Sequence, residues 1–386
     1  MRDRTSWVDR RLAVDDDVLP LDKFDRAIIV GGGKAAGDLA VAVADRLGGV
    51  LPVSGVVSVP GRQTRHHDRI ILRGVRDWSR NEVTPEAVRA TAEMLRQFEQ
   101  ADGRTLVVAV ITGGGSALIS QPTIAVERMN SRAHAIAAVG GDIRAVNEYR
   151  ASVDSIKSGG LARAVQRCPG PPTLVTLCIS DVIGDDPAVI ASGPTATNPP
   201  MHFHVLGNNA VAVDAAGIAA ESLGYNHVMR CDVGPQPSAE QAGRQMVHAM
   251  SAMRPPTSRA AAVQHDALIT GGEPTVRLSD RSTRGRGGRN GQLVLAALVE
   301  LRQRFIHFPP LTLLSAGTDG EDGTSDSAGA WIDPAVDARA RELRLDPADY
   351  LAHHNSHEFF DRCGGLLQTG PTGTNVCDVR VATWSR

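Results

Sequence analysis

Short apolar runs rich in β-branched residues alternate with alanine-rich stretches along most of the chain. Runs of this length predict strands buried on both faces, and the stretches between them predict helices. In the first half, the pattern predicts strands at Arg26–Val30, Gly55–Val59, Thr105–Thr112 and Thr173–Ser180, and helices at 34–47, 84–97 and 208–223. In the second half, it predicts strands at Ala267–Thr270 and Leu311–Ser315 and a helix at Asn290–Arg304. This alternation indicates an α/β fold built on doubly wound sheets with helices on both faces.

The chain length predicts more than one domain, because 386 residues exceed what one compact core usually holds. The segment 231–237 (CDVGPQP) has the composition of a linker, and the segment 254–258 (RPPTS) is a surface break soon after it. We therefore expect an N-terminal domain over residues 1–235 and a C-terminal domain over residues 236–386.

Composition removes several classes of protein. A hydrophobic content of 42% and a charged content of 22% are ordinary for globular proteins. No apolar run reaches the length of a membrane-spanning helix, and the first residues lack the apolar core of a signal peptide. The net charge of −2 gives no general attraction to nucleic acid or anionic membranes. The five cysteines are scattered, which favours a reducing, cytoplasmic location without disulfides or a zinc ribbon. A homodimer is compatible with the sequence, which does not determine the oligomeric state.

Two biases point to a ligand site. Lysine occurs only at positions 23, 34 and 157, although lysine and arginine together number 41. Glycine, with 39 residues, gathers in short clusters that mostly follow the predicted strands. Glycine at strand ends lets the backbone approach a ligand, although simple turns also use it. In open α/β sheets ligands bind outside the carboxyl ends of the strands, so we expect the site along that edge.

The first cluster, VGGGKAAGDLA, lies between a predicted strand and helix. Its spacing fits a loose dinucleotide fingerprint, but the next strand ends in Pro60 where an acidic residue should bind the ribose. The cluster also departs from a phosphate-binding Walker loop. Gly32, Gly33 and Lys34 therefore predict a helix start that binds an anion or a transferring phosphoryl group. The alternative is that Lys34 only begins an exposed helix.

Two further clusters in the first half carry polar groups. The loop Gly113, Gly114, Gly115 and Ser116 offers backbone N–H groups and a hydroxyl for a phosphate or carboxylate. Asp181, Asp185 and Asp186 follow the next strand, and carboxylates gathered at a strand end suit Mg²⁺. For Asp185 and Asp186, capping a turn is an equal alternative.

The second half supplies a further acidic residue and an arginine-rich loop. Glu273 lies at a strand end, and Arg284, Arg286 and Arg289 crowd the glycine-rich loop before a helix. Guanidinium groups there suit carboxylate or phosphate recognition by forked hydrogen bonds. Nucleic-acid binding is disfavoured because aromatic residues make up only 4% of the chain. Asp319, Asp322 and Asp326 lie in a later loop, and Thr372, Thr374 and Asn375 form a tight turn before the last strand. The adjacent histidine pairs 66–67 and 353–354 are interpreted as surface residues, and no histidine pair with metal-ligand spacing is identified.

Together these motifs resemble the glycerate 2-kinase family of the MOFRL type, whose members are often mislabelled hydroxypyruvate reductase. In order, they read GGGKAAGDLA, TGGGSAL, SDVIGDDPAVIASGPT, GGEPTV, GRGGRNGQ, AGTDGEDGTSDSAGA and TGPTGTNVCD. The resemblance implies two three-layer α/β domains, the N-terminal one Rossmann-like, with the active site in the cleft between them. It also implies ATP- and Mg²⁺-dependent phosphorylation of the 2-hydroxyl of D-glycerate.

Residue roles follow from the same resemblance and from the chemistry above. The family's catalytic lysine and arginine correspond to Lys34 and Arg289, and Asp181 and Glu273 are the expected Mg²⁺ ligands. The expected substrate- or nucleotide-binding residues are Gly32, Gly33, Gly113, Gly114, Gly115, Ser116, Arg150, Lys157, Arg286, Asn290, Asp319, Gly320, Thr374 and Asn375. Asp181 and Asp319 are the two candidates for the general base.

Departures from the family pattern bear on the acceptor substrate. The family's Gly-His-Pro segment is missing from RDWSRNEVTPE, and Ser152 and Asp154 stand where histidine and serine are expected. We therefore expect the acceptor substrate to be D-glycerate or a closely related hydroxy acid, with an altered preference among such acids. The alternatives are an NAD(P)H-dependent hydroxypyruvate reductase and a non-catalytic protein that binds a sugar acid.

Overall fold

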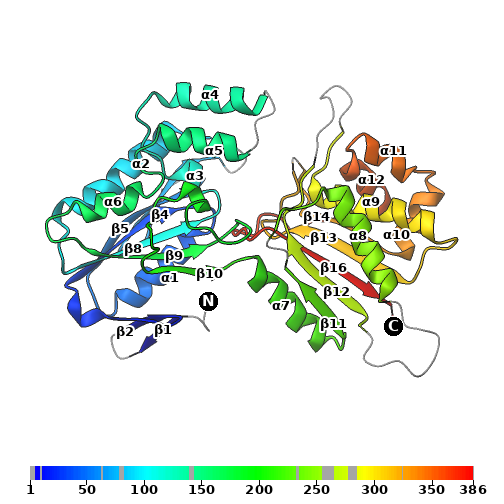
Figure 1. Ribbon diagram of the computed structural model, residues 1–386, viewed down its shortest axis with the longest axis horizontal. Coiled ribbons are helices and arrows are strands. Elements are labelled where there is room, and N and C mark those ends of the chain that lie inside the picture. The colour runs from blue at the N-terminus through cyan, green and yellow to red at the C-terminus, as the bar shows by residue number, and fades with distance from the viewer. Residues whose placement is uncertain are drawn as a thin grey trace. The chain divides into compact units, whose positions relative to one another are not determined.

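The computed structural model describes residues 5–8, 11–61, 64–77, 82–138, 143–231, 234–253, 265–276, 285–323 and 325–385 (Figure 1). Contacts between Cα atoms divide the chain into two compact units, 1–207 and 208–386. Each unit contains its own sheet and its own helices, so the protein has a mixed α/β fold. Among the described residues, no helix combines the length and the apolar character needed to cross a membrane.

The sheet of the first unit has seven strands in the order β10-β9-β8-β4-β5-β7-β6. Their bounds are β4 Arg26–Gly32, β5 Val53–Pro60, β6 Arg65–His66, β7 Ile71–Arg76, β8 Thr105–Thr112, β9 Thr173–Ile179 and β10 Phe203–Gly207. All pairs are parallel except β6 with β7. Numbered along the chain, the parallel strands lie in the order 3-2-1-4-5-6, which is a doubly wound order with its switch point between β4 and β8.

Helices cover both faces of this sheet (Figure 1). On one face, α1 (Ala36–Leu47) packs its buried side chains against the core that includes Val57 and Val108. On the other face, α2 (Pro85–Arg96) and α6 (Gly160–Gln166) contribute Met94 and Leu161 to a second core. Every residue of β8 is buried, as the uninterrupted apolar run predicts for a central parallel strand. The remaining helices of this unit are α3 Gly115–Leu118, α4 Val126–Ala138 and α5 Ile143–Ser152, with 3₁₀ turns η1 Leu21–Lys23, η2 Gln97–Gln100 and η3 Ile190–Ser192.

An antiparallel sheet of three strands precedes the main sheet: β1 (Thr5–Val8), β2 (Arg11–Val14) and β3 (Asp17–Pro20). The sequence analysis did not identify it, because each of its strands has only four residues. Leu12 and Val14 nevertheless join the core on the α1 face of the main sheet. The added sheet is therefore part of the first unit.

The second unit contains a six-stranded mixed sheet in the order β11-β12-β16-β13-β14-β15. Only β11 with β12 is parallel, so this sheet is not the parallel one that the alternating pattern indicated. The strands are β11 His227–Arg230, β12 Ala267–Gly272, β13 Leu311–Gly317, β14 Gly329–Ile332, β15 Leu366–Leu367 and β16 Asp378–Trp384. β16, near the C-terminal end of the chain, lies between β12 and β13. Local sequence patterns do not reveal such a pairing between distant segments.

Helices also cover the second sheet on both faces. The larger core lies on the face covered by α8 (Ala239–Ala252), α9 (Arg289–Arg304), α10 (Pro334–Glu342), α11 (Pro347–Ala352) and α12 (Ser356–Cys363). On the other face, α7 (Asn209–Ser222) packs Val213 and Ala220 against Ile269. The sequence analysis placed α7 and β11 before the domain boundary at 235/236, whereas the compact units divide at 207/208. The linker-like segment lies between β11 and α8, two elements of the second unit, and composition alone does not distinguish such a loop from a linker.

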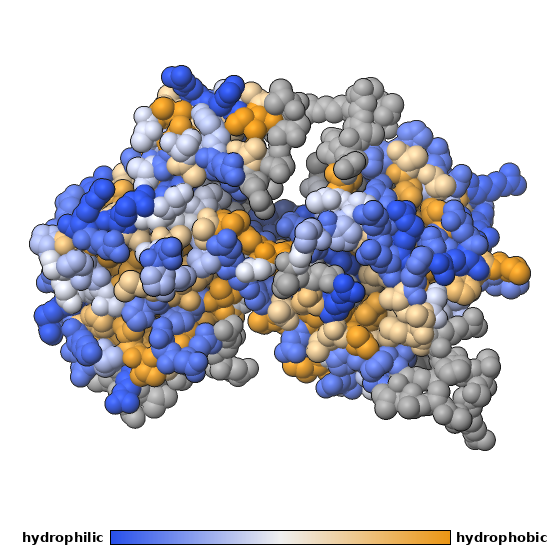
Figure 2. All heavy atoms as spheres, viewed as in Figure 1, coloured by the Kyte–Doolittle hydropathy of each residue, from blue (hydrophilic) through white to orange (hydrophobic). Residues whose placement is uncertain are grey.

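Large exposed apolar side chains occur in both units: Val18, Val189, Met201, Val211, Ile218, Leu223, Met229 and Ile306. Figure 2 shows hydrophobic residues interspersed with hydrophilic ones on this face of each unit. Isolated exposed apolar residues are normal for globular proteins and need no partner to explain them.

Candidate functional site

In the first unit, the two glycine-rich loops that follow β4 and β8 lie against each other at the switch point of the sheet. The backbone N–H of Lys34 donates to the carbonyl of Gly113 at 2.8 Å. The backbone N–H of Ala35 donates to the Thr112 hydroxyl at 3.1 Å. These bonds bring the GGGK and TGGGS motifs together, as expected for loops at the carboxyl ends of adjacent parallel strands.

Glycine is required at two positions of these loops. Gly33 has a φ of +148°, and a Cβ atom there would overlap the side chain and backbone of Thr112. Gly114 has a φ of +78° and precedes the first turn of α3. Side chains at either position would strain the backbone or separate the two loops.

Two cationic side chains approach Gly114. A Cβ atom on Gly114 would lie 3.5 Å from Cγ of Lys34 and 3.6 Å from Nη2 of Arg76. Arg76 ends β7, where its backbone pairs with Gly61, and is only 5% exposed. The sequence analysis missed Arg76 because β7 was not predicted. The paired cations beside a glycine loop suit an anionic ligand.

The acidic residues that follow β9 make different contacts. A Cβ atom on Gly113 would overlap the Asp181 carboxylate, so Asp181 lies directly against the TGGGS loop. Asp186 instead accepts from the N–H of Ala188 at 2.9 Å and caps a turn. For Asp186, the turn alternative is therefore the one that the geometry supports. Ser116 also has a hydroxyl neighbour, because its Oγ lies 3.2 Å from Oγ of Ser192.

Lys157 is buried beneath the TGGGS loop. Its ammonium donates to the carbonyls of Ser116 at 2.8 Å and Ile119 at 2.5 Å, and the residue is 1% exposed. Burial lowers its pKa to about 8, partly offset by the charge of Asp154. This geometry favours a positioning role for Lys157 over contact with a ligand. Arg150 is also buried, and burial lowers its pKa despite the nearby Glu82.

In the second unit, Arg289 begins α9 and forms a forked ion pair with Asp378, the first residue of β16. Nε and Nη2 of Arg289 donate to the two carboxylate oxygens at 2.7 and 2.9 Å. Nη1 lies 3.0 Å from Oε1 of Glu273, which follows β12. The Asp378 side chain is fully buried. The structure thus places the guanidinium fork on Asp378, a residue that the sequence analysis did not select.

The charged groups around Arg289 have shifted pKa values. Burial opposes its positive charge, but the bonds to Asp378 and the charge of Glu273 outweigh burial and raise the pKa of Arg289. Burial raises the pKa of Glu273, and the charges of Asp378 and Asp319 add to this effect against the attraction of Arg289. Burial also raises the pKa of Asp322 to about 6, although Asp322 accepts from the N–H groups of Asn290 and Gly291 at 2.8 Å.

The other expected residues of this unit hold the loops together. Asn290 is fully buried and accepts from the Ser315 hydroxyl at 2.5 Å. Arg286 is exposed and pairs with Asp326 at 2.9 Å, while Arg284 lies outside the described residues. The remaining residues contact the loops around them. Asp319 accepts from the N–H of Glu321, Gly320 packs against Gly370, the Thr372 hydroxyl donates to the carbonyl of Thr374, and Asn375 accepts from the N–H of Cys377.

The donor set fits Mg²⁺ in its chemistry. Glu273 has other carboxylates close enough to raise its pKa, so a divalent cation would relieve their repulsion. Mg²⁺ prefers oxygen ligands and usually takes only one or two carboxylates from a protein. Asp181 in the first unit offers a further carboxylate beside the TGGGS loop.

Comparisons with known proteins cover nearly the whole chain. Family models match residues 3–209, described as a domain of unknown function (DUF4147), and residues 266–378, described as the MOFRL family. A glycerate kinase from Bos taurus is 32% identical over 96% of this chain and 88% of its own length. A D-glycerate 2-kinase from Thermotoga maritima is 29% identical over 94% and 92% of the two chains. A relative from Agrobacterium vitis, 32% identical over 96% and 90% of the two chains, carries a hydroxypyruvate reductase name. The solved structure of a Thermotoga maritima glycerate kinase superimposes with a TM-score of 0.77 at 28% identity, over 94% and 92% of the two chains.

Proposed function

Since this chain belongs to the glycerate kinase family, we propose that it is an ATP- and Mg²⁺-dependent kinase acting on the 2-hydroxyl of D-glycerate or a closely related small hydroxy acid. The relative from Thermotoga maritima is named for this position of phosphorylation. The single structural observation that carries the proposal is the convergence of Lys34 and Arg76 on Gly114 at the switch point of the first sheet.

Phosphoryl transfer depends on positioning and charge neutralisation more than on covalent chemistry. Lys34 is proposed to stabilise charge on the transferring phosphoryl group, as the catalytic lysine of the family. Arg76 is proposed to bind an anionic group of the substrate or nucleotide beside the same glycine loop. Lys157 would keep that loop in place through its bonds to the carbonyls of Ser116 and Ile119.

Arg289 is the proposed catalytic arginine. A guanidinium has five N–H donors, and the fork to Asp378 engages only Nε and one N–H of Nη2. Nη1 also lies 3.0 Å from Oε1 of Glu273, so one N–H of Nη1 and one of Nη2 are left to bind phosphoryl oxygens while Asp378 keeps the guanidinium plane fixed. Such a preorganised donor stabilises the transition state without reorganising during the reaction.

Asp181 and Glu273 are the proposed carboxylate ligands of Mg²⁺, directly or through water. When bound, Mg²⁺ would neutralise negative charge on the phosphates. Asp181 and Asp319 are the two candidates for the general base that takes the proton of the acceptor hydroxyl. The described cysteines are all free, which supports a reducing compartment such as the cytoplasm.

The reductase alternative has weaker support. β5 ends in Pro60, and the dinucleotide fingerprint needs an acidic residue at the end of that strand. A non-catalytic binding protein would keep the anion-binding loops but show no turnover.

One assay separates these functions. ADP release and NADH absorbance are followed in parallel with D-glycerate, ATP and Mg²⁺, and then with hydroxypyruvate and NADH. We expect ADP release that stops on chelation of Mg²⁺, and a product that phosphorus NMR identifies as the 2-phosphate. NADH oxidation without ADP release would refute the kinase proposal, and binding of glycerate without either reaction would support the non-catalytic alternative.

The acceptor is tested with a panel of small hydroxy acids. Asp154 is buried and accepts from the Ser120 hydroxyl and from the N–H groups of Gln121 and Ile156, so it stabilises a loop where the family has a different residue. We expect the preference among hydroxy acids to be relaxed or shifted while ATP affinity is unaffected. A strict preference for D-glycerate over every other acid in the panel would contradict the expected change in acceptor preference.

A further inference from the structure

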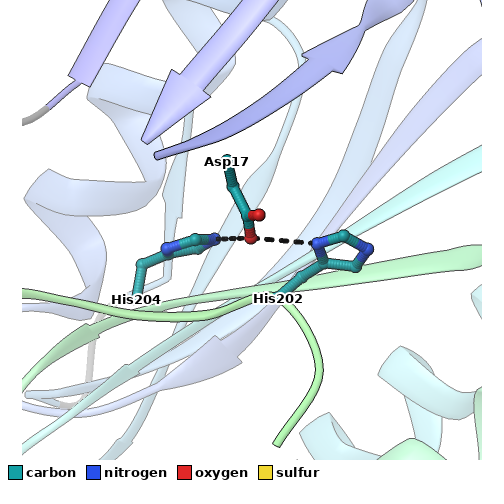
Figure 3. Close-up of side chains that lie close together, drawn as sticks. All are labelled: Asp17, His202 and His204. Atoms are coloured by element: carbon teal, nitrogen blue, oxygen red, sulfur yellow. Dashed lines mark hydrogen bonds and ion pairs between the residues drawn. The ribbon is translucent and has the colours of Figure 1, made fainter. Parts of the chain in front are cut away.

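Two histidines and an aspartate gather away from the glycine-rich loops of the first unit (Figure 3). Asp17 begins β3, His202 directly precedes β10, and His204 lies in β10. β10 is an edge strand of the main sheet. Lys34 and Asp181 follow the carboxyl ends of the parallel strands, whereas His202 lies at the amino end of β10, so this cluster is separate from the proposed catalytic residues.

Both histidine rings contact the same carboxylate oxygen of Asp17. Oδ2 of Asp17 lies 3.2 Å from Nδ1 of His202 and 3.3 Å from Nε2 of His204. Figure 3 shows one ring nitrogen of each histidine next to this oxygen. The three ligand atoms lie within 4.8 Å of one another, and no other group of three such residues was found within the described ranges.

These distances suit a metal ion. With metal–ligand bonds of about 2.0–2.1 Å, neighbouring donors of a tetrahedral zinc site lie roughly 3.3 Å apart. The two Asp17–histidine distances have this value, and only the two nitrogens would need to approach each other. Nδ1 of His202 is within hydrogen-bond distance of this oxygen, and one carboxylate oxygen can accept from two rings, so an ion would replace a pair of hydrogen bonds.

Two further features favour ligation. Nδ1 of His204 lies 3.9 Å from Oδ2 of Asp15, beyond hydrogen-bond distance, and the negative charge of this carboxylate beside the ring favours a bound cation. His202 has a φ of 44°, a left-handed conformation that is uncommon for residues other than glycine and is often found at functional positions. His204 is 8% exposed while His202 is half-buried, so an ion could enter from the His202 side.

We propose that Asp17, His202 and His204 form a zinc-binding site that fastens the N-terminal three-stranded sheet to the edge strand β10. Two imidazoles and one carboxylate are a donor set that Zn²⁺ accepts, with water in the fourth position. The ion would stabilise the first unit, because it joins β3 to β10 away from the proposed phosphoryl-transfer residues, while the water leaves its fourth position open. The sequence analysis overlooked the spaced pair in His202-Phe203-His204, because the partner aspartate lies far away along the chain.

The test uses the full chain after metal removal, with Zn²⁺ alone as the probe in titration calorimetry and Co²⁺ as a spectroscopic substitute. We expect saturable binding of one ion, a four-coordinate Co²⁺ absorption band and a rise in the melting temperature on addition of Zn²⁺. H202N, H204N and D17N should each weaken binding by at least tenfold, and D15N by about tenfold, as for other carboxylates that support a ligand.

The matched control is H353N. His353 is an exposed histidine whose ring lies 3.3 Å from the carboxylate of Asp349, without a second histidine. This variant should bind Zn²⁺ as the wild type does. Absence of saturable binding by the wild type, or unchanged binding by the H202N/H204N double variant, would overturn the proposal. If one variant fails to fold, the partly exposed His202 provides the decisive substitution.

Discussion

Arg289 and Asp378 form a two-bond ion pair that joins the first turn of α9 to the first residue of β16. The bonds measure 2.7 and 2.9 Å, and the carboxylate is fully buried. A buried carboxylate that accepts both bonds from one guanidinium holds its plane in a single orientation. The pair therefore orients the proposed catalytic arginine from a strand far away along the chain.

The first prediction concerns Arg289→Lys. Lysine keeps the positive charge but cannot form the fork to Asp378 and cannot present planar donors to a phosphoryl group. We expect turnover to fall by roughly a hundredfold or more, as for removal of other preorganised donors. Steady-state kinetics would measure the change. Arg339→Lys, in an exposed pair with Glu342, is the matched control and should leave turnover unaltered. Kinetics of Arg289→Lys within a few-fold of the wild type would show that the guanidinium is not engaged in the transition state.

The second prediction concerns Lys34→Ala. Removing the ammonium of Lys34, whose Cγ lies beside Gly114, should lower turnover by on the order of a hundredfold or more while the melting temperature stays nearly constant. The backbone bond from Lys34 to Gly113 does not depend on the side chain, so the two glycine loops should stay together. Lys23→Ala, at an exposed lysine, is the control. Near-wild-type turnover of the Lys34 variant would remove Lys34 from the catalytic residues.

The third prediction concerns Asp322. Burial raises the pKa of the Asp322 carboxyl group from its ordinary value of 3.8 to about 6 in the folded protein. The unfolded chain, which has the ordinary pKa, therefore loses the carboxyl proton at a lower pH than the folded protein does. Asp322 therefore favours folding most below pH 4, and its contribution declines as pH rises to about 6. Relative to Asp322→Asn, the free energy of unfolding of the wild type should fall by on the order of 2–3 kcal/mol across this window. Urea unfolding at several pH values measures the difference, and a difference that is independent of pH would refute the prediction.

The fourth prediction concerns Lys157. Burial lowers its pKa from 10.5 to about 8, so between these values the unfolded chain binds more protons than the folded protein. The free energy of unfolding of the wild type should therefore rise with pH in this range. Relative to that of Lys157→Met, the rise should be on the order of 3 kcal/mol. At neutral pH the methionine variant should also lose activity, because the carbonyls of Ser116 and Ile119 lose their donor and the TGGGS loop is displaced. An equal pH response of the two proteins would show that the amine does not titrate in this range.

Much of the fold could be predicted because it depends on local patterns. The run from Thr105 to Thr112 is apolar between its two threonines, and it forms the central strand β8 with the predicted bounds. The helix predicted at 84–97 forms as α2, which Thr84 caps before Pro85: the Thr84 hydroxyl accepts from the N–H of Ala87 at 3.1 Å. Both predictions need only the chemistry of neighbouring residues.

The site could be predicted in part for the same reason. Lys34 and Gly113–Ser116 were selected because glycine clusters follow strands, and the structure brings these two loops together. Arg76 and Asp378 were missed, because nothing in their sequence neighbourhoods shows that β7 and β16 bring them to Gly114 and Arg289. Lys157 was selected as a binding residue, but its burial gives it a positioning role.

The sequence by itself determined the α/β class, four strands of the first sheet (β4, β5, β8 and β9), the helices α1 and α2, and the loops that carry Lys34 and Arg289. These features follow from periodicity and from residue types with strong local preferences. Only the tertiary structure decided the mixed order of the second sheet, the partner of Arg289 and the meeting of Asp17 with His202 and His204. Each of these depends on contacts between segments far apart in the chain, whose pairing is set by the packing of the whole unit rather than by any single segment.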